Sequence, residues 1–196
     1  MVTQSKKRLN RIARQKLSMR KSLWPAVDDD QLWDRQKSDG WLSIPRAMPL
    51  ILRILDMLAP KGKPVSQTYL DLWCRTFDDA FVIVSKPREM TYYSGFSGER
   101  AERTWVSRMA ILADLGFIDF RPGTNGLVHY VLLYNPYHVI KRHHQAGRMN
   151  ESAYNALTER VIEIGADDLD FPLEPTEAKA VARKTRKRSR SKKVGA

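Results

Sequence analysis

The chain has 196 residues, with 34 lysines and arginines against 22 acidic residues, a formal net charge of +12 and a 42% hydrophobic fraction. This length suits one domain with appendages, and a single cysteine excludes an internal disulfide and a cysteine-thiolate zinc site. No apolar run follows the basic N-terminus, and no uninterrupted apolar segment is long enough to cross a bilayer, so we expect a cytoplasmic protein with no membrane partner.

The basic charge is concentrated at the two ends of the chain. Of the 34 basic residues, eight lie in 1–23 and nine in 179–193, where there is no acidic residue. The other 17 share residues 24–178 with all 22 acidic residues, which leaves that body at −5. Such basic ends bind polyanions through counterion release, with little regard to sequence.

We expect residues 1–23 to be a disordered arm that can become helical when it binds, and residues 166–196 to be a linker and a basic disordered tail. A membrane-surface helix is an alternative for the arm, but its apolar face is thin, which favours nucleic acid.

Short helices and one strand are predicted before residue 86. Asp30 is expected to cap a helix over 31–36. A helix over 46–58 follows Pro45, although Pro49 in its first turns allows a later start. Ser66 is expected to cap a helix over 67–76. The β-branched run AFVIV at 80–84 predicts a strand.

Residues 86–134 carry the strongest pattern. A short helix, a turn at 95–97 and a longer helix over 98–115 are predicted, with Ser97 capping the longer helix and Gly116 ending it. Two strands, 119–121 and 127–134, then flank a hairpin loop at 122–126.

The longer helix has two distinct faces. An apolar stripe predicts the side that packs in the core: Ala101, Trp105, Met109 and Leu112. A second stripe is polar and rich in groups that bond phosphates and base edges: Arg100, Arg103, Thr104 and Ser107.

Helix, turn, helix and hairpin in this order resemble the winged-helix (helix-turn-helix) DNA-binding family. The resemblance is carried by residues 97–118 and the hairpin, and extends to 45–134. The phrases SKPREM, SGFSGERAERTW and LYNPYHVIK are also similar to winged-helix proteins carried on bacterial plasmids. The resemblance implies a mainly α fold with a small antiparallel sheet, in which the strand at 80–84 pairs with the hairpin. It also implies a winged helix-turn-helix over 24–134, with an N-terminal helical extension and C-terminal helices over 135–165.

The resemblance also supplies candidate DNA contacts, because the N-terminal part of the second helix of such a motif enters the major groove. The candidates for base contact are Arg100, Arg103, Thr104 and Ser107. The candidates for the phosphate backbone are Lys86, Arg88, Tyr92, Ser94, Arg108 and, on the hairpin, Arg121. Glu99 and Glu102 either select cytosine or pair with Arg103; a solvated face with such ion pairs is the alternative reading of these arginines.

Two helices are predicted after the hairpin, over 137–145 and, capped by Asn150 or Ser152, up to about Gly165. Tyr154, Leu157, Val161, Ile162 and Ile164 form the apolar set of the second. Packing against their own domain and packing against a second subunit are equally consistent with this set.

The sequence contains none of the common motifs that place catalytic residues together. There is no phosphate-binding glycine loop, no Gly-x-Ser-x-Gly and no His-Glu-x-x-His, so we expect no enzyme, no cofactor and no metal site. Cys74 is interpreted as a buried structural thiol, His143 and His144 as surface residues, and His129 and His138 as structural.

The sequence therefore favours a sequence-specific protein that binds double-stranded DNA as a possible homodimer: a transcriptional regulator, or a plasmid replication or partition factor. The alternatives are an RNA-binding or ribosome-associated basic protein, and a winged-helix protein-interaction module. The RNA alternative is disfavoured because no aromatic pair is expected on an exposed sheet face.

Overall fold

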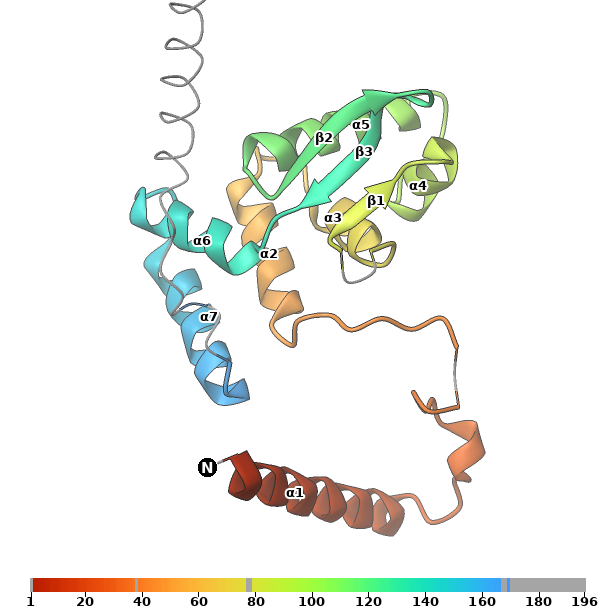
Figure 1. Ribbon diagram of the computed structural model, residues 1–196, viewed down its shortest axis with the longest axis vertical. Helices are drawn as coiled ribbons and strands as arrows, with labels where there is room; N and C mark the ends of the chain where they lie inside the picture. The colour runs from red at the N-terminus through yellow and green to blue at the C-terminus, as the bar shows by residue number, and fades with distance from the viewer. Residues whose placement is uncertain (1, 38, 77–78, 167–168, 170–196) are drawn as a thin grey trace, which may run out of the picture. The chain divides into compact units, whose positions relative to one another are not determined.

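A computed structural model describes residues 2–37, 39–76, 79–166 and 169. Over these residues the chain forms seven α-helices, one short 3₁₀ helix and a three-stranded antiparallel sheet (Figure 1). The fold is mixed α/β, and the predicted combination of helices with a small antiparallel sheet is confirmed. The chain divides into two compact units, Met1–Ser43 and Ile44–Ala196, and each is described by itself.

The first unit contains helix α1 (Val2–Leu23) and the 3₁₀ turn η1 (Asp29–Gln31). The sequence favours a disordered arm over 1–23, whereas this segment is helical in the structure. The physical reason is local: no glycine or proline occurs before Pro25, and Arg20 and Lys21 in the last turn complement the helix dipole. The helix predicted over 31–36 does not form, because the helical hydrogen bonding stops at Gln31 and Leu32 is extended.

The second unit begins with α2 (Met48–Leu58) and α3 (Ser66–Trp73), which pack against each other. Pro49 lies in the first turn of α2, so the helix has the later start that this proline allows. The prediction that Ser66 caps α3 is wrong. Asp56, which projects from α2, accepts from Val65 N at 2.7 Å and from Ser66 N at 2.9 Å, so a carboxylate from a neighbouring helix caps α3.

The sheet is built from β1 (Phe81–Ile83), β2 (Ile118–Gly123) and β3 (Gly126–Leu133) in the spatial order β1-β3-β2, so the first strand pairs with the second arm of the hairpin (Figure 1). The residues paired across all three strands form three rows, and the middle row is Val82, Val131 and Phe120. One flanking row is Phe81, Leu132 and Asp119, and the other is Ile83, Tyr130 and Arg121. The strand predicted at 80–84 and its pairing with the hairpin are therefore confirmed.

Between β1 and β2 lie α4 (Pro87–Tyr93) and α5 (Ala101–Asp114). Gly95 adopts a left-handed conformation after α4, and Phe96 N donates to Thr91 O at 3.1 Å, a glycine-terminated helix end. The prediction that Ser97 caps α5 from Gly98 onward is wrong, because Gly98 has a φ of +86° and α5 begins only at Ala101, with Arg100 at the cap position.

The last two helices, α6 (Pro136–Gln145) and α7 (Glu151–Ile164), pack against each other, and α7 also packs against α2. Asn135 caps α6 by accepting from Tyr137 N. Of the two caps predicted for α7, Asn150 and Ser152, the structure has Asn150, which accepts from Ser152 N. Of the predicted apolar set of α7, Leu157 and Val161 are buried, whereas Ile162 is 72% exposed and does not pack in the core of the second unit.

One hydrophobic core joins these elements. It draws on α2, α3, the inner faces of β1 and β3, one face of α5, and the C-terminal helices. Its largest fully buried side chains include Trp105, Tyr69, Phe117, Met48, Ile51, Leu55 and Leu72. Trp105, Met109 and Leu112 of α5 are 1% exposed or less, which confirms the predicted apolar stripe.

Candidate nucleic-acid interface

The candidate interface is the exposed side of α5 together with α4 and the turn between them. Arg100, Arg103 and Ser107 are exposed, on the side of α5 opposite Trp105, Met109 and Leu112. The helix therefore directs one face into the core and presents a polar face to solvent. Residues 86–108 carry five basic and three acidic side chains, a local net charge of +2 within a body of net negative charge.

The arginines of this face have no partner within the described residues. Neither Arg100 nor Arg103 makes a side-chain hydrogen bond or ion pair there, and Glu99 and Glu102 do not pair with Arg103 although the spacing allows it. The alternative interpretation of these arginines, a solvated helix face with ion pairs to Glu99 or Glu102, is therefore not seen among the described residues. Unpaired guanidinium groups can accept a bidentate partner such as guanine or phosphate.

Thr104 is half-buried and its hydroxyl donates to Arg100 O at 2.9 Å. The hydroxyl proton is committed to the helix itself, so this residue can act toward a base only as an acceptor. An acceptor at this position suits the amino groups of adenine or cytosine.

Arg108 is half-buried beside the core stripe. Its guanidinium carbon lies 5.7 Å from the centre of the Phe96 ring, and its Nε is buried without a hydrogen-bond partner among the described residues. The side chain therefore packs over the turn between α4 and α5. Its contact with phosphate stays a prediction.

The candidates on α4 differ from one another. Arg88 and Tyr92 are exposed, Tyr92 at 72%. Lys86 forms an ion pair with Glu89 at 2.9 Å, and this carboxylate raises the pKa of the lysine. Ser94 is 3% exposed with its Oγ buried, so its assignment as a backbone contact is wrong: the left-handed turn at Gly95 places it against the core.

Helix α3 holds the C-terminal end of α4 in place. Gln67 Nε2 donates to Tyr93 O at 3.2 Å, and the Arg75 guanidinium lies 5.4 Å from the centre of the Tyr93 ring. Arg75 in turn donates to both carboxylate oxygens of Asp71, whose pKa is raised by burial. These contacts fix the helix that precedes the turn, and so the direction in which α5 starts.

On the hairpin, Arg121 is exposed and pairs with Asp119 at 2.7 Å. Asn125 at the hairpin tip donates to Val84 O at 3.1 Å and to Ser85 O at 3.2 Å, which ties the loop to the end of β1. The tip is thus anchored beside the start of α4.

Sequence reasoning missed the exposed aromatic side chains of the sheet. Phe81 and Tyr130 stack at 6.1 Å on the face turned away from the core, where no aromatic pair was expected. The run LVHYVLLY could have indicated them, because it has apolar residues on both faces of its strand. Such a strand is typical of a sheet that is covered on both sides.

The histidine and cysteine assignments also change. His143 is 2% exposed, its Nε2 lies 2.8 Å from Leu115 O, and its ring stacks on Phe117, so it is a core residue rather than a surface one. Burial lowers the pKa of His143.

Cys74 is exposed, not buried as predicted. Partial desolvation, together with the nearby Asp71, raises the pKa of its thiol.

His144 is half-buried and stacks on Tyr154 at 3.7 Å, with Nε2 2.7 Å from Glu151. The two adjacent histidines thus occupy different sides of α6: His143 contacts the end of α5, and His144 contacts α7. The described residues contain no group of three or more His, Cys, Asp or Glu side chains placed to hold a metal ion.

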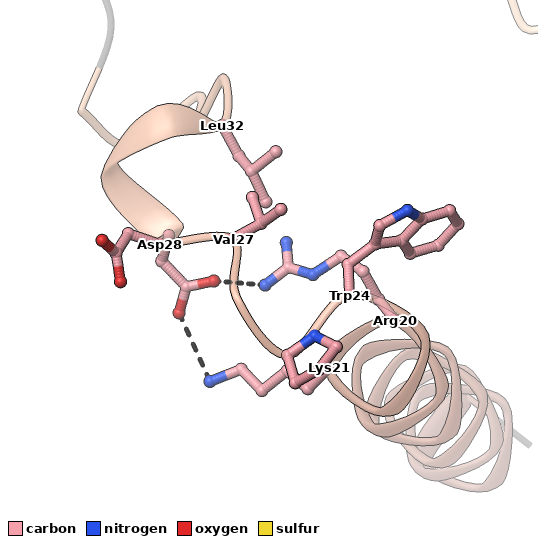
Figure 2. A pocket seen from close by; sticks show the side chains of 8 residues that line it. Arg20, Lys21, Trp24, Val27, Asp28 and Leu32 are labelled. Atoms are coloured by element: carbon pink, nitrogen blue, oxygen red, sulfur yellow. Dashed lines mark hydrogen bonds and ion pairs between the residues drawn. The ribbon is translucent and has the colours of Figure 1, made fainter.

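The first unit has a separate pocket of about 570 Å³ at the C-terminal end of α1 (Figure 2). Arg20 and Lys21 point toward the turn that carries Asp28, and both pair with Asp29, whose pKa they lower. Trp24, Val27 and Leu32 form its apolar part. The lining carries two cations and two carboxylates, with Arg20 and Lys21 both paired to Asp29, and it contains no serine, cysteine or histidine, so it presents no catalytic constellation of these residue types.

No helix in the described ranges is both long and apolar enough to span a membrane. No family model matches the chain, and comparisons with curated proteins and with solved structures likewise found no match. The arrangement of the residues is therefore the basis for the function proposed below.

Proposed function

We propose that the second unit is a winged helix and that the chain binds a specific site in double-stranded DNA. Its biological role would be that of a transcriptional regulator, or of a plasmid replication or partition factor. The order α4, turn, α5 and hairpin, and the pairing of β1 with β3, support this proposal. The basic ends would add affinity for neighbouring phosphates without reading sequence.

One observation carries the proposal. Arg100, Arg103 and Ser107 are exposed, and their side chains have no partner among the described residues; they lie on the N-terminal half of a helix whose other face is anchored in the core. A rigid helix with free guanidinium groups at its N-terminal end is what major-groove readout requires. The anchoring of α4 by α3 would hold that helix against the backbone while α5 enters the groove.

The test is selection from random DNA duplexes with the full-length protein, at about 150 mM salt so that binding through the basic ends is weakened. We expect an enriched motif. Arg103→Ala should then weaken binding to the selected duplex by about 1–3 kcal/mol and leave binding to an unrelated duplex almost unchanged. The matched control is Arg53→Ala, an exposed arginine on α2, which should not alter the preference.

Failure to enrich any motif, or equal preference by the Arg103→Ala variant and the wild type, would contradict the proposal. If binding is sequence-independent and falls steeply with salt, the protein coats polyanions through its ends, and the next measurement would be RNA binding.

A further inference from the structure

The sheet has an apolar face that none of the described elements of the second unit covers. Along β1, Phe81 and Ile83 are 37% and 56% exposed while Val82 between them is buried. Along β3, Tyr130 and Leu132 are 40% and 42% exposed while Val131 and Leu133 are buried. These four side chains, together with Asp119 and Arg121 on β2, are called the outer sheet face.

The size of this face sets what it can bind. Four apolar side chains of roughly 200 Å² each, a little under half exposed, present roughly 350 Å², and Tyr134, 41% exposed, follows directly after β3. Single exposed apolar residues are ordinary, but a contiguous patch of about 300–600 Å² on a monomer usually marks an interaction site. With a polar rim added, the area that this face could bury is close to, but smaller than, the roughly 800 Å² per partner that a stable complex buries.

The charge on this face is balanced internally. Asp119 and Arg121 are its charged groups among the described residues, and they pair with each other at 2.7 Å. A surface of this kind has no excess positive charge to attract a polyanion, and the carboxylate would repel phosphate. The stacked rings of Phe81 and Tyr130 also cover part of each other, which leaves less ring surface for bases. The face is better suited to protein than to nucleic acid.

We propose that the outer sheet face docks on the same face of a second copy of this chain. The register makes the face self-complementary. A two-fold axis between two such sheets, perpendicular to the strands, places one row against the other: Phe81 opposite the second copy's Ile83, and Leu132 opposite its Tyr130. The same axis brings Asp119 opposite the second copy's Arg121, so apolar groups meet apolar groups and opposite charges meet.

This docking leaves the candidate contacts on α4 and α5 free, whereas Arg121 on the hairpin lies within the docking face. Helix α5 packs against β2, and its buried residues share one core with Val82 and Val131, which point to the inner side of the sheet. A second copy on the outer side therefore does not cover Arg100 or Arg103. The dimer is a property of the protein without DNA, so its test is independent of the proposed function.

The experiment measures the mass of the full-length protein by sedimentation equilibrium from about 1 to about 200 µM, in roughly 0.5 M NaCl to screen the basic ends. We expect a monomer–dimer equilibrium with a dissociation constant on the order of 10 µM, because an interface of this small size gives weak association. The variant Ile83→Lys should raise this constant roughly tenfold or more, because the symmetry places two lysines in the contact. Leu132→Lys tests the second strand, and Ile162→Lys, an equally apolar exposed residue on α7, is the matched control and should leave it unchanged.

A wild-type protein that stays monomeric at about 200 µM overturns the proposal, and so does a dimer that resists Ile83→Lys and Leu132→Lys but dissociates with Ile162→Lys. A folded monomer that binds a labelled oligothymidine, and loses this binding with Tyr130→Ala, would show that single-stranded nucleic acid occupies the face instead. Circular dichroism of each variant establishes that it is folded.

Discussion

Removal of the Asp56 carboxylate should destabilise the second unit, because this side chain caps α3 from a neighbouring helix. One oxygen, Oδ1, accepts from Val65 N at 2.7 Å and from Ser66 N at 2.9 Å. Val65 is fully buried, so Asp56→Ala leaves its N–H without access to water, which costs about 1–3 kcal/mol. Ser66 is only half-buried, and its N–H can bond to water, so its loss adds a smaller amount.

The expected total for Asp56→Ala is about 2–3 kcal/mol, since loss of an N-terminal cap by itself costs about 0.5–2 kcal/mol. For a unit of this size that corresponds to a fall in Tm of roughly 10 °C. Asp56→Asn keeps an acceptor oxygen and loses only the interaction of the charge with the helix N-terminus, about 0.3–1 kcal/mol. The measurement is urea unfolding followed by tryptophan fluorescence.

The matched control is Ser66→Ala, which removes the cap that the sequence predicts. Because the Ser66 side chain makes no capping hydrogen bond, this variant should change the free energy of unfolding by less than about 0.5 kcal/mol. The reasoning is refuted if Ser66→Ala costs more than Asp56→Ala, because the local residue would then be the cap.

Two further predictions concern His143 and Gly123. Burial holds the pKa of His143 below its ordinary 6.5. As the pH falls below about 6.5, the unfolded chain therefore takes up a proton that the folded protein does not. The free energy of unfolding then decreases, by at most about 1.4 kcal/mol per pH unit. His143→Gln can still donate to Leu115 O but does not titrate, so unfolding free energies measured from pH 7 to pH 5 should fall less steeply than in the wild type; equal slopes would exclude His143 as the source. At the hairpin, a Cβ on Gly123 would overlap the His129 ring and lie 2.9 Å from His129 Cβ, so Gly123→Ala should cost about 1–3 kcal/mol. Gly126→Ala cannot serve as the control, because the φ of +113° at Gly126 is itself unfavourable for alanine. The control is Thr124→Ala at the exposed tip. Equal free energies of unfolding for Gly123→Ala and Thr124→Ala would contradict the steric explanation.

Much of the fold was predictable because it depends on short-range pattern. The stripe of Trp105, Met109 and Leu112 defines the buried side of α5, and the polar stripe opposite it follows from the same helical period. The ends of α5 and α7 follow from Gly116 and Gly165, which take the left-handed conformation that ends helices. The hairpin, the strand at β1 and the caps by Asn135 and Asn150 are local in the same sense.

Several errors of prediction concern contacts between segments distant in sequence, whereas those at Ser97 and over 31–36 have local causes in the backbone conformations of Gly98 and Leu32. Asp56 replaces Ser66 as a cap because α2 packs beside the start of α3. His143 is buried because α6 docks against the end of α5, where Leu115 O meets its ring, and Ser94 is buried because the Gly95 turn directs it inward. Periodicity says which residues share a face and not which face is covered.

By itself, the sequence determined the two basic ends, the amphipathic α5 with Arg100 and Arg103 on one side, and the order of a short helix, a turn, a longer helix and a hairpin. Only the tertiary structure decided that these arginines lack ion-pair partners in the part of the chain that it describes, and that Gln67 of α3 donates to the end of α4. It also decided that Phe81, Ile83, Tyr130 and Leu132 gather on one uncovered side of the sheet. The reason is that side-chain alternation is fixed by strand geometry, whereas the identity of neighbouring strands and the covering of each face depend on how the whole chain packs.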